Sequence, residues 1–301
     1  MTEPRADAES RHPARSALLR FATRALDGLL ERLDWNEAQA FGRRLGRTGW
    51  RLAARDRTRS LEHLEIAFPE RTLEARERLS RASFEHFGAM LAECLWLRHR
   101  GETELRRRVA MEGWEHVEAA RAEGRPIHIA TGHCGNWEML AAALNAHGLG
   151  MAVVARELDD PGLQALLVDF RSRFGSRTIV RGAPGAARDL LRALRGGGAL
   201  GMLIDQDTRV DGVWVPFFGR PAYTPVGAAD LARRWNAVVL PTFIERLPDG
   251  SHRATIHPRL DLPADPTAAT AAMTAAIEAQ IRRVPDQWVW MHRRWRRQPG
   301  S

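Results

Sequence analysis

Lysine is absent from this chain of 301 residues, so all 45 of its basic side chains are arginines. The absence excludes chemistry that needs a lysine amine, such as Schiff-base formation. Arginine instead supplies a planar, permanently charged group that suits phosphate and carboxylate ligands. The formal net charge is +8, which favours an anionic partner: nucleic acid, anionic lipid or an acidic protein.

Cysteine is scarce, with only Cys94 and Cys134 present. Two cysteines are too few for a disulfide framework or a structural zinc site, so a reducing cytosolic setting is expected. Long apolar runs are missing as well. The longest uncharged stretch, 139–155, is broken by polar residues and glycines, and the charged N-terminus lacks the apolar core of a signal peptide. These features argue against a polytopic membrane protein.

The first third of the chain has a helical pattern. Residues 1–13 are expected to be a disordered tail, and 14–110 a helical region in which Thr72 caps a helix that begins after Pro69. Residues 14–33 carry an apolar stripe with most of their arginines outside it. This segment is either an ordinary helix packed on the core or an amphipathic helix lying in the interface of an anionic membrane.

After residue 110 short β-like runs alternate with helical patterns. The strands are expected at 126–131, 151–156, 177–181 and 199–204, and the helices between and after them at 136–147, 161–173, 184–195, 225–235 and 266–283. Two further runs, at 237–246 and 253–260, are expected to be paired strands. This alternation predicts an α/β fold with a central, mostly parallel sheet flanked by helices. The core would span 111–301 and form one integrated domain with 36–110.

One short stretch carries an unusual density of polar groups. Residues 129–140 read I-A-T-G-H-C-G-N-W-E-M-L, with apolar residues on both sides. Asn136 is a suitable N-cap for the helix that follows, so His133 is expected in a strand-to-helix turn and Glu138 in the first helical turn. Ligands of open α/β sheets bind at the carboxyl ends of strands, and this turn lies at such an end.

His133 and Glu138 therefore form a candidate catalytic dyad. With His133 in the loop, its ring can fold back onto the carboxylate, which would fix the tautomer and make the other ring nitrogen a general base. Such a dyad lacks a protein nucleophile and suits activation of a substrate hydroxyl. Three alternatives stay open: a zinc site, which lacks a third nearby ligand; Cys134 as nucleophile, although adjacent residues rarely face each other; and a purely structural histidine.

The pair also matches a family pattern. It fits H-x-x-x-x-D/E, and the sequence resembles the bacterial lipid A late acyltransferases (lauroyl and myristoyl transferases) within the wider lysophospholipid and glycerolipid acyltransferase fold. The resemblance covers about residues 40 to 297. Three longer segments carry it: R-T-R-S-L-E-H-L-E-I-A-F-P-E at 57–70, D-Q-D-T-R-V-D-G-V-W-V-P-F-F-G-R-P-A-Y-T-P at 205–225, and P-D-Q-W-V-W-M-H-R-R-W at 285–295.

The resemblance implies a second functional pair, an arginine and an aspartate. They fall on Arg171, in V-D-F-R-S-R-F-G, and on Asp205, in I-D-Q-D. Asp205 is expected to end a strand next to the strand that precedes His133, or close to it, and so to line the same crevice. Further candidates for substrate binding are Asn136, Arg173, Arg181 and Asp207.

The implied activity is acyl transfer. His133, oriented by Glu138, would take the proton of an acceptor hydroxyl as it attacks an acyl thioester. Arg171 or backbone N–H groups would bind the oxyanion. The thiolate leaving group needs little acid assistance, and no metal or redox cofactor is implied.

The implied partners are anionic or lipidic. The donor would be acyl carrier protein or acyl-CoA, and the acceptor an anionic glycolipid, most simply a lipid A precursor. V-P-F-F-G-R-P-A-Y at 215–223 would provide an apolar wall for an acyl chain. The implied location is the cell inner membrane, peripheral on its cytoplasmic side, because 14–33 is shorter and more basic than the anchor usual in the family. A second departure, His63 in place of the usual asparagine, lies in a segment expected to be scaffold.

Other functions remain possible on the sequence alone. The acceptor could be another glycolipid or an aminolipid, for example of the inositol mannoside type. The chain could also be a non-catalytic arginine-rich protein of the membrane surface. Nucleic-acid binding through the arginine- and tryptophan-rich tail at 289–297 is a third candidate, but no recognition module is visible, so no nucleic-acid partner is expected.

Overall fold

The computed structural model describes residues 25–158 and 160–299. Residues 1–24 lie outside this description, so it does not address the tail expected at 1–13 or most of the amphipathic helix expected at 14–33. The remainder of that segment, 25–32, is helical. Within the described part of the chain, no helix has the length and apolar character needed to span a bilayer.

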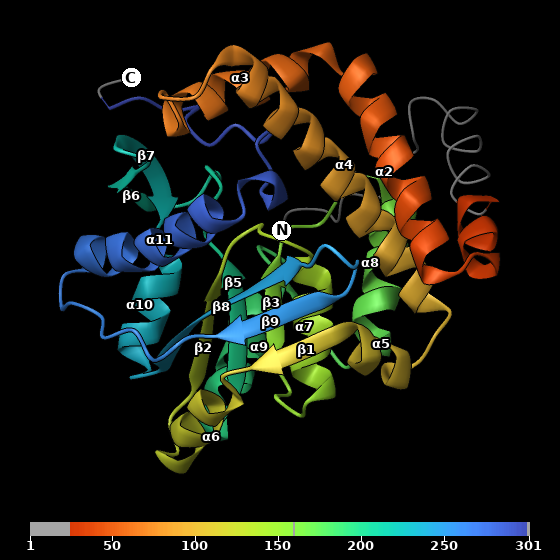
Figure 1. The fold of residues 1–301 in the computed structure, drawn as a ribbon. Coiled ribbons are helices and arrows are strands. Elements are labelled where there is room, and N and C mark those ends of the chain that lie inside the picture. The colour runs from red at the N-terminus through yellow and green to blue at the C-terminus, as the bar shows by residue number, and fades with distance from the viewer. Residues whose placement is uncertain (1–24, 159, 300–301) are drawn as a thin grey trace, which may run out of the picture.

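A layer of helices precedes the sheet (Figure 1). They are α2 (Trp35–Leu52), α3 (Ala54–Ala67), α4 (Leu73–Arg98) and α5 (Glu102–Arg108). The cap expected at Thr72 is confirmed, because its side chain accepts a hydrogen bond from the N–H of Ala75. Helix α2 packs closely along α4: a Cβ added at Gly42 would lie 2.5 Å from the carbonyl oxygen of Gly88, so the two backbones touch at this point.

A seven-stranded sheet forms the centre of the molecule, in the order β1-β9-β8-β2-β5-β3-β4. Its strands are β1 (Val109–Glu112), β2 (Ile127–Thr131), β3 (Ala152–Ala155), β4 (Arg177–Val180), β5 (Ala199–Leu203), β8 (Val238–Arg246) and β9 (His252–Ile256). Neighbouring strands are parallel except β8 and β9, which pair antiparallel. The expected mostly parallel sheet and the expected strand pair are both confirmed.

Helices connect and cover these strands. They are α6 (Trp114–Ala122), α7 (Trp137–Ala146), α8 (Pro161–Arg173), α9 (Ala186–Leu194), α10 (Gly227–Arg234) and α11 (Pro266–Arg283). Three features were not expected: strand β1, which follows the arginine-rich α5, helix α6, and the separate hairpin of β6 (Gly212–Phe217) and β7 (Arg220–Pro225). The strands among them are short pieces whose sequence lacks a sustained hydrophobic period.

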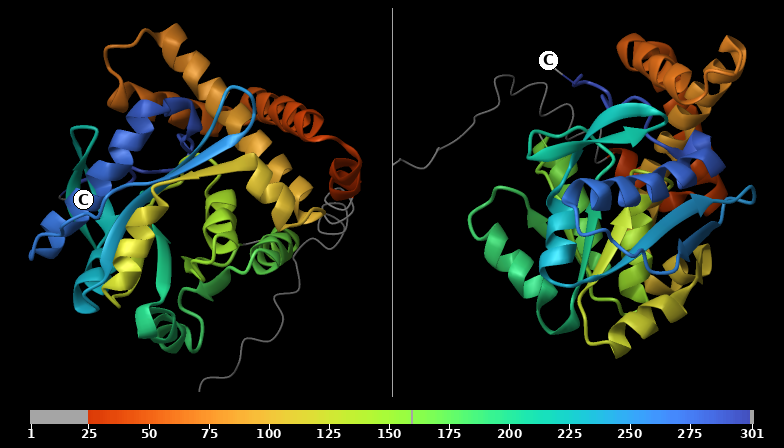
Figure 2. Two further views of the ribbon diagram at one scale, coloured as in Figure 1. Left: turned by 60° about the horizontal axis from the view of Figure 1, so that its bottom comes forward. Right: turned by 90° about the vertical axis from the view of Figure 1, so that its left-hand side faces the viewer.

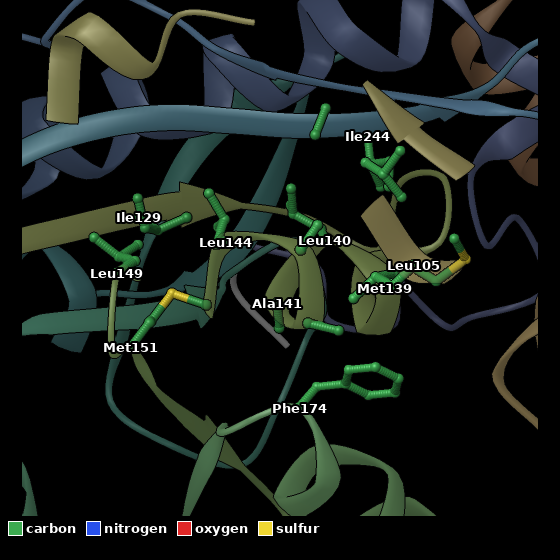
Figure 3. Packing of buried hydrophobic residues seen from close by; sticks show 14 of the residues in the cluster. Leu105, Ile129, Met139, Leu140, Ala141, Leu144, Leu149, Met151, Phe174 and Ile244 are labelled. Atoms are coloured by element: carbon green, nitrogen blue, oxygen red, sulfur yellow. The ribbon is translucent and has the colours of Figure 1, made fainter. Parts of the chain in front are cut away.

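The core holds the β2–α7 unit in place. Every residue of β2 is buried, and so is every residue of α7 from Glu138 to Leu144. On one side of the sheet Ile129 joins a cluster with Met139 and Leu140 of α7 (Figure 3). On the other side Ala130 joins a cluster with Ile277 of α11; Figure 2 shows α11 (blue) lying against the strands. Burying a large aliphatic side chain stabilises a fold by about 1.5–3 kcal/mol. The turn between β2 and α7 therefore connects two elements that are firmly packed in the core.

Candidate active site

The turn that carries His133 has the expected position. It begins after Thr131, the last residue of β2, and ends at Asn136, whose side chain accepts a hydrogen bond from the N–H of Met139 and caps α7. Gly135 has φ +59°, and a Cβ there would lie 1.9 Å from the carbonyl oxygen of Ile244. Only glycine fits this conformation and this close approach, so the turn is held tightly against β8.

Asp205 is the carboxylate that contacts His133. It follows β5, which pairs with β2, as expected for a residue lining the same crevice. Its Oδ1 lies 2.7 Å from Nδ1 of His133, and its Oδ2 accepts the backbone N–H of His133 at 2.8 Å. Oδ2 also accepts the indole N–H of Trp288 at 2.7 Å. Burial raises the pKa of Asp205, but the charge of His133 and these hydrogen bonds outweigh it and hold the pKa below its usual range.

This contact defines the state of the histidine ring. An ionised carboxylate can only accept, so Nδ1 of His133 carries the proton and the neutral ring has its lone pair on Nε2. Asp205 is fully buried, whereas the His133 side chain is 21% exposed. The ring also packs edge-on against Trp137, with centroids 4.8 Å apart. His133 is thus fixed on its buried edge, while part of its side chain remains accessible.

Glu138 has a different partner. Its Oε1 accepts from Nη2 of Arg171 at 2.7 Å, and its Oε2 accepts from Nε of Arg171 at 2.8 Å. The two side chains are 7% and 11% exposed. Burial lowers the pKa of Arg171, but the hydrogen bonds and charge of Glu138 raise it overall, so this is a bidentate ion pair in a mostly buried setting. Trp137 adds a hydrogen bond from its indole N–H to Oε1 at 3.2 Å.

The expected pairing is therefore corrected in one respect. Glu138 was expected to orient the ring of His133, but the carboxylate on Nδ1 is that of Asp205. The reason is that Arg171, from α8, occupies both oxygens of Glu138. Asp205, just after the adjacent strand β5, accepts a hydrogen bond from the backbone N–H of His133. The four residues form two neighbouring pairs instead of a His133–Glu138 dyad plus a separate Arg171–Asp205 pair.

The other candidates lie farther from this arrangement. Arg173 is exposed in the last turn of α8. Arg181 is exposed and donates to Thr208 at 3.4 Å. Asp207 is buried and binds the C-terminal segment, where it accepts from Arg296 and from the backbone of Arg297. Asp207 thus anchors that segment in the structure.

Two segments singled out in the sequence, one apolar and one basic, are packed into the fold. Phe217 and Phe218, expected in a wall for an acyl chain, are buried in the core, where Phe217 packs against Trp288 and Trp295. The tail at 289–297, considered as a basic nucleic-acid contact, is an integral part of the fold: Arg294 is fully buried. Figure 1 shows this segment (dark blue) passing beneath α3.

The open alternatives for the turn can also be weighed. Cys134 is 2% exposed, and burial, reinforced by the charge of Asp205, raises the pKa of its thiol well above the usual value. A buried, protonated thiol is a poor nucleophile. Within the described ranges, no group of three or more histidine, cysteine or carboxylate side chains is arranged to hold a metal ion.

Sequence reasoning missed two residues that contact the His133–Asp205 pair. Trp288 binds Asp205 and Trp137 packs on His133. Trp288 stands in the segment P-D-Q-W-V-W-M-H-R-R-W, which carried the resemblance, and Trp137 in the opening stretch. The sequence motifs indicated that both segments belong to the functional region. They did not show which carboxylate the indole of Trp288 would bind.

Comparison with known proteins identifies the family of the chain. Residues 6–297 match the family described as bacterial lipid A biosynthesis acyltransferase, and the chain belongs to this family. It is an acyltransferase of the lipid A biosynthesis type, and the resemblance drawn from the sequence is confirmed.

Individual relatives extend the comparison. The chain is 29% identical over 243 residues to the lipid A biosynthesis acyltransferase of Haemophilus influenzae, covering 79% of this chain and 75% of that protein. It is 27% identical over 276 residues to the lipid A biosynthesis lauroyltransferase of Escherichia coli, covering 90% and 89%. It is also 29% identical over 222 residues to the phosphatidylinositol mannoside acyltransferase of Mycobacterium tuberculosis, covering 71% and 69%.

Proposed function

We propose that this chain transfers a fatty acyl group from an acyl thioester to a hydroxyl of a lipid acceptor, with His133 as the general base. The observation that carries the proposal is the contact between Nδ1 of His133 and the buried carboxylate of Asp205. It leaves Nε2 as the proton acceptor of a ring that is partly open to solvent. The family supports the reaction class, and this geometry supports His133 as the base.

The reaction needs one proton to be moved twice. Nε2 of His133 takes the proton of the acceptor hydroxyl while the oxygen forms a bond to the thioester carbonyl carbon. The tetrahedral intermediate then collapses, the carbon–sulfur bond breaks, and the imidazolium returns the proton to the departing thiolate. Asp205 stabilises the imidazolium without taking its proton. General-base assistance of this kind contributes about a hundred- to ten-thousandfold to the rate.

Arg171 is the group that we propose binds negative charge in the site. Glu138 holds its Nε and Nη2, which fixes the plane of the guanidinium and leaves Nη1 at its far edge. A guanidinium oriented in this way can donate to the developing oxyanion or to an anionic group of the acceptor. In this proposal Glu138 acts by orienting Arg171.

Apolar side chains near the base support a lipid acceptor. Phe87 and Leu91 lie one turn apart on α4 and are 41% and 38% exposed. The ring of Phe87 is 6.0 Å from that of Trp137, which in turn packs on His133. Exposed aromatic and aliphatic groups beside a catalytic ring suit an acyl chain. We propose a lipid A precursor as acceptor and acyl carrier protein or acyl-CoA as donor, both anionic and suited to an arginine-rich protein.

The proposed location is the cytoplasmic side of the inner membrane, with peripheral attachment. Exposed leucines of the N-terminal helices, Leu29, Leu45 and Leu52, support contact with lipid, and the arginines around them support anionic lipid. Residues 1–24 would add to this contact. Because Leu30 is fully buried, a deletion should stop at residue 24. We expect that deletion to weaken cosedimentation with anionic vesicles, and unchanged cosedimentation would contradict the proposed role of the segment.

A transfer assay tests the function directly. Purified protein is incubated with labelled acyl carrier protein or acyl-CoA and with a lipid A precursor, and the products are identified by mass spectrometry. We expect the mass of one fatty acyl ester to be added to the precursor. Acylation of an inositol mannoside alone would replace the proposed acceptor, and no acylated lipid from either donor would contradict the function.

A further inference from the structure

A second buried charged pair lies behind the site. Glu93 of α4 is fully buried and is bound by Arg246, the last residue of β8, through Nε at 2.7 Å and Nη2 at 2.9 Å. Burial raises the pKa of Glu93, but the charges and hydrogen bonds of Arg246 and His252 together outweigh burial and hold the pKa well below its usual value. Glu93 is therefore a carboxylate. A buried charge of this kind is weak evidence for stability, so another role has to be considered.

Glu93 also holds the start of α7. Its Oε2 accepts from Nδ2 of Asn136 at 2.9 Å, and its Oε1 accepts from Nε2 of Gln39 at 2.6 Å. The other end of the Asn136 side chain caps α7 by accepting the N–H of Met139. Asn136 lies between the loop that carries His133 and the first helical turn that carries Glu138. Its position therefore fixes the backbone from which both side chains extend.

Arg246 holds the opposite side of the same turn. Its backbone N–H donates to Oε1 of Gln287 at 2.8 Å, and its carbonyl accepts from Nε2 of Gln287 at 2.9 Å. The carbonyl of Gln287 then accepts the N–H of Gly135 at 2.8 Å. The next residue, Trp288, donates its indole N–H to Asp205. The ion pair is thus hydrogen-bonded to Asn136, two residues before Glu138, and to Gln287, whose chain neighbour Trp288 binds Asp205.

We propose that Glu93 and Arg246 are positioning residues of the acyl transfer: the pair fixes the turn between His133 and Glu138 and the indole that holds Asp205. This inference rests on the proposed function, because it assigns the pair to that same site. Neither residue contacts the reacting atoms. A turn displaced by 1 Å can cost about a hundredfold in rate, so a small shift of Asn136 or Trp288 is sufficient.

A neighbouring ion pair provides a matched control. Glu245 precedes Arg246 in β8 and is 4% exposed. It binds Arg253 of β9 through Nε at 3.0 Å and Arg283, the last residue of α11, at 2.7 Å. This cluster has the same chemistry and a buried carboxylate, with more exposed arginines, but it ties β8 to β9 and α11 instead of to the turn of His133. Loss of either carboxylate should destabilise the fold, whereas only loss of Glu93 should disturb the site.

The experiment compares Glu93→Gln with Glu245→Gln in the full chain. We expect Glu93→Gln to lower kcat about ten- to a hundredfold with KM changed by less than about threefold, since orientation and not binding is lost. Glu245→Gln should keep kcat within about threefold, with its fall in melting temperature measured alongside that of Glu93→Gln. Wild-type kcat in folded Glu93→Gln, or an equal fall of kcat in both variants, would overturn the proposal.

Two further measurements keep the test independent of folding and of the reaction. Asn136→Ser retains an N-cap acceptor but cannot donate to Glu93 as the amide does, and it should lower kcat in the same way. Amide exchange followed by mass spectrometry should be about tenfold faster at residues 133–139 in Glu93→Gln, the equivalent of one lost hydrogen bond, and unchanged there in Glu245→Gln. Unchanged exchange at residues 133–139 in Glu93→Gln would overturn the proposal about the ion pair. Absence of acyl transfer by the wild-type chain would count against the proposed function alone.

Discussion

Nδ1 of His133 lies 2.7 Å from Oδ1 of Asp205, and the other oxygen of this carboxylate accepts the backbone N–H of the same histidine. One buried carboxylate therefore fixes both the ring and the backbone of the proposed base. Trp288 adds a third hydrogen bond from the C-terminal segment. Asp205 lies 72 positions from His133 in the chain, and Trp288 lies 83 positions from Asp205. The orientation of the His133 ring is therefore a property of the assembled fold.

Replacement of Asp205 by asparagine should abolish most of the activity. The amide can present N–H to Nδ1 and so favour the tautomer with its lone pair on the wrong nitrogen. We expect kcat for acyl transfer to fall about a hundred- to ten-thousandfold, with the far-UV circular dichroism unchanged. Trp288→Phe removes only one hydrogen bond of the carboxylate and should cause a smaller loss. Near-normal turnover of folded Asp205→Asn would show that the ring is oriented by another group.

Stability and activity should depend differently on the Glu138–Arg171 pair: removing both charges should restore stability but not turnover. Arg171→Met leaves a buried carboxylate without its partner, so we expect it to destabilise the fold by about 3–5 kcal/mol. The double variant Glu138→Gln with Arg171→Met removes both charges and should regain much of this stability, measured by urea unfolding. Turnover should stay low in both variants because the oriented guanidinium is lost. Recovery of turnover in the double variant would contradict the proposed role of Arg171.

His128 should make the protein sensitive to mild acid. It lies in β2, is 1% exposed, and neither ring nitrogen has a hydrogen-bond partner among the described residues. Burial lowers its pKa to about 4 from 6.5. Between these values the unfolded chain binds a proton that the folded chain does not, so stability falls as the pH drops, by about 1.4 kcal/mol per pH unit.

The variant His128→Leu isolates this contribution. It removes the titrating group without breaking a hydrogen bond, so the loss of unfolding free energy between pH 7 and pH 5 should shrink by about 2 kcal/mol. Urea unfolding at the two pH values measures the difference. An identical pH dependence in His128→Leu and the wild type would show that other groups control acid stability.

Cys134 should be dispensable for catalysis despite its place beside His133. Its thiol is buried, and burial raises its pKa, so at neutral pH it is protonated and shielded. We expect Cys134→Ala to keep kcat within about threefold, and the native wild-type thiol to resist alkylation by iodoacetamide. Loss of transfer on alkylation of Cys134 in the native protein would instead revive a thiol nucleophile.

Local pattern was sufficient for most of the fold. Helix α8 has the predicted bounds, α7 is one residue shorter than predicted at each end, and β5 is one residue shorter at its C-terminal end. Each has a clear hydrophobic period and a capping residue or turn at its boundary. Strand β1 was missed because four residues with mixed burial offer no period. The β6–β7 hairpin was missed for a similar reason, since its apolar run resembled a loop against the core.

The site was predictable as a set of residues but not as a set of contacts. His133, Glu138, Arg171 and Asp205 all lie together in the structure. Their pairing depends on strand order and on the path of α8, neither of which a single sequence encodes locally. Glu138 is near His133 in the chain, and this proximity favoured the wrong partner. Glu93 and Arg246 were missed because nothing in their own segments signals a role at a turn far along the chain.

The central claim is that Nε2 of His133 removes the proton of the acceptor hydroxyl. The most direct test measures kcat for acyl transfer by His133→Gln at saturating donor and acceptor, with wild-type protein as reference and melting temperature as the control for folding. The account predicts a fall of about a hundred- to ten-thousandfold, with KM for both substrates little changed. Turnover within about threefold of the wild type in a folded variant would contradict it.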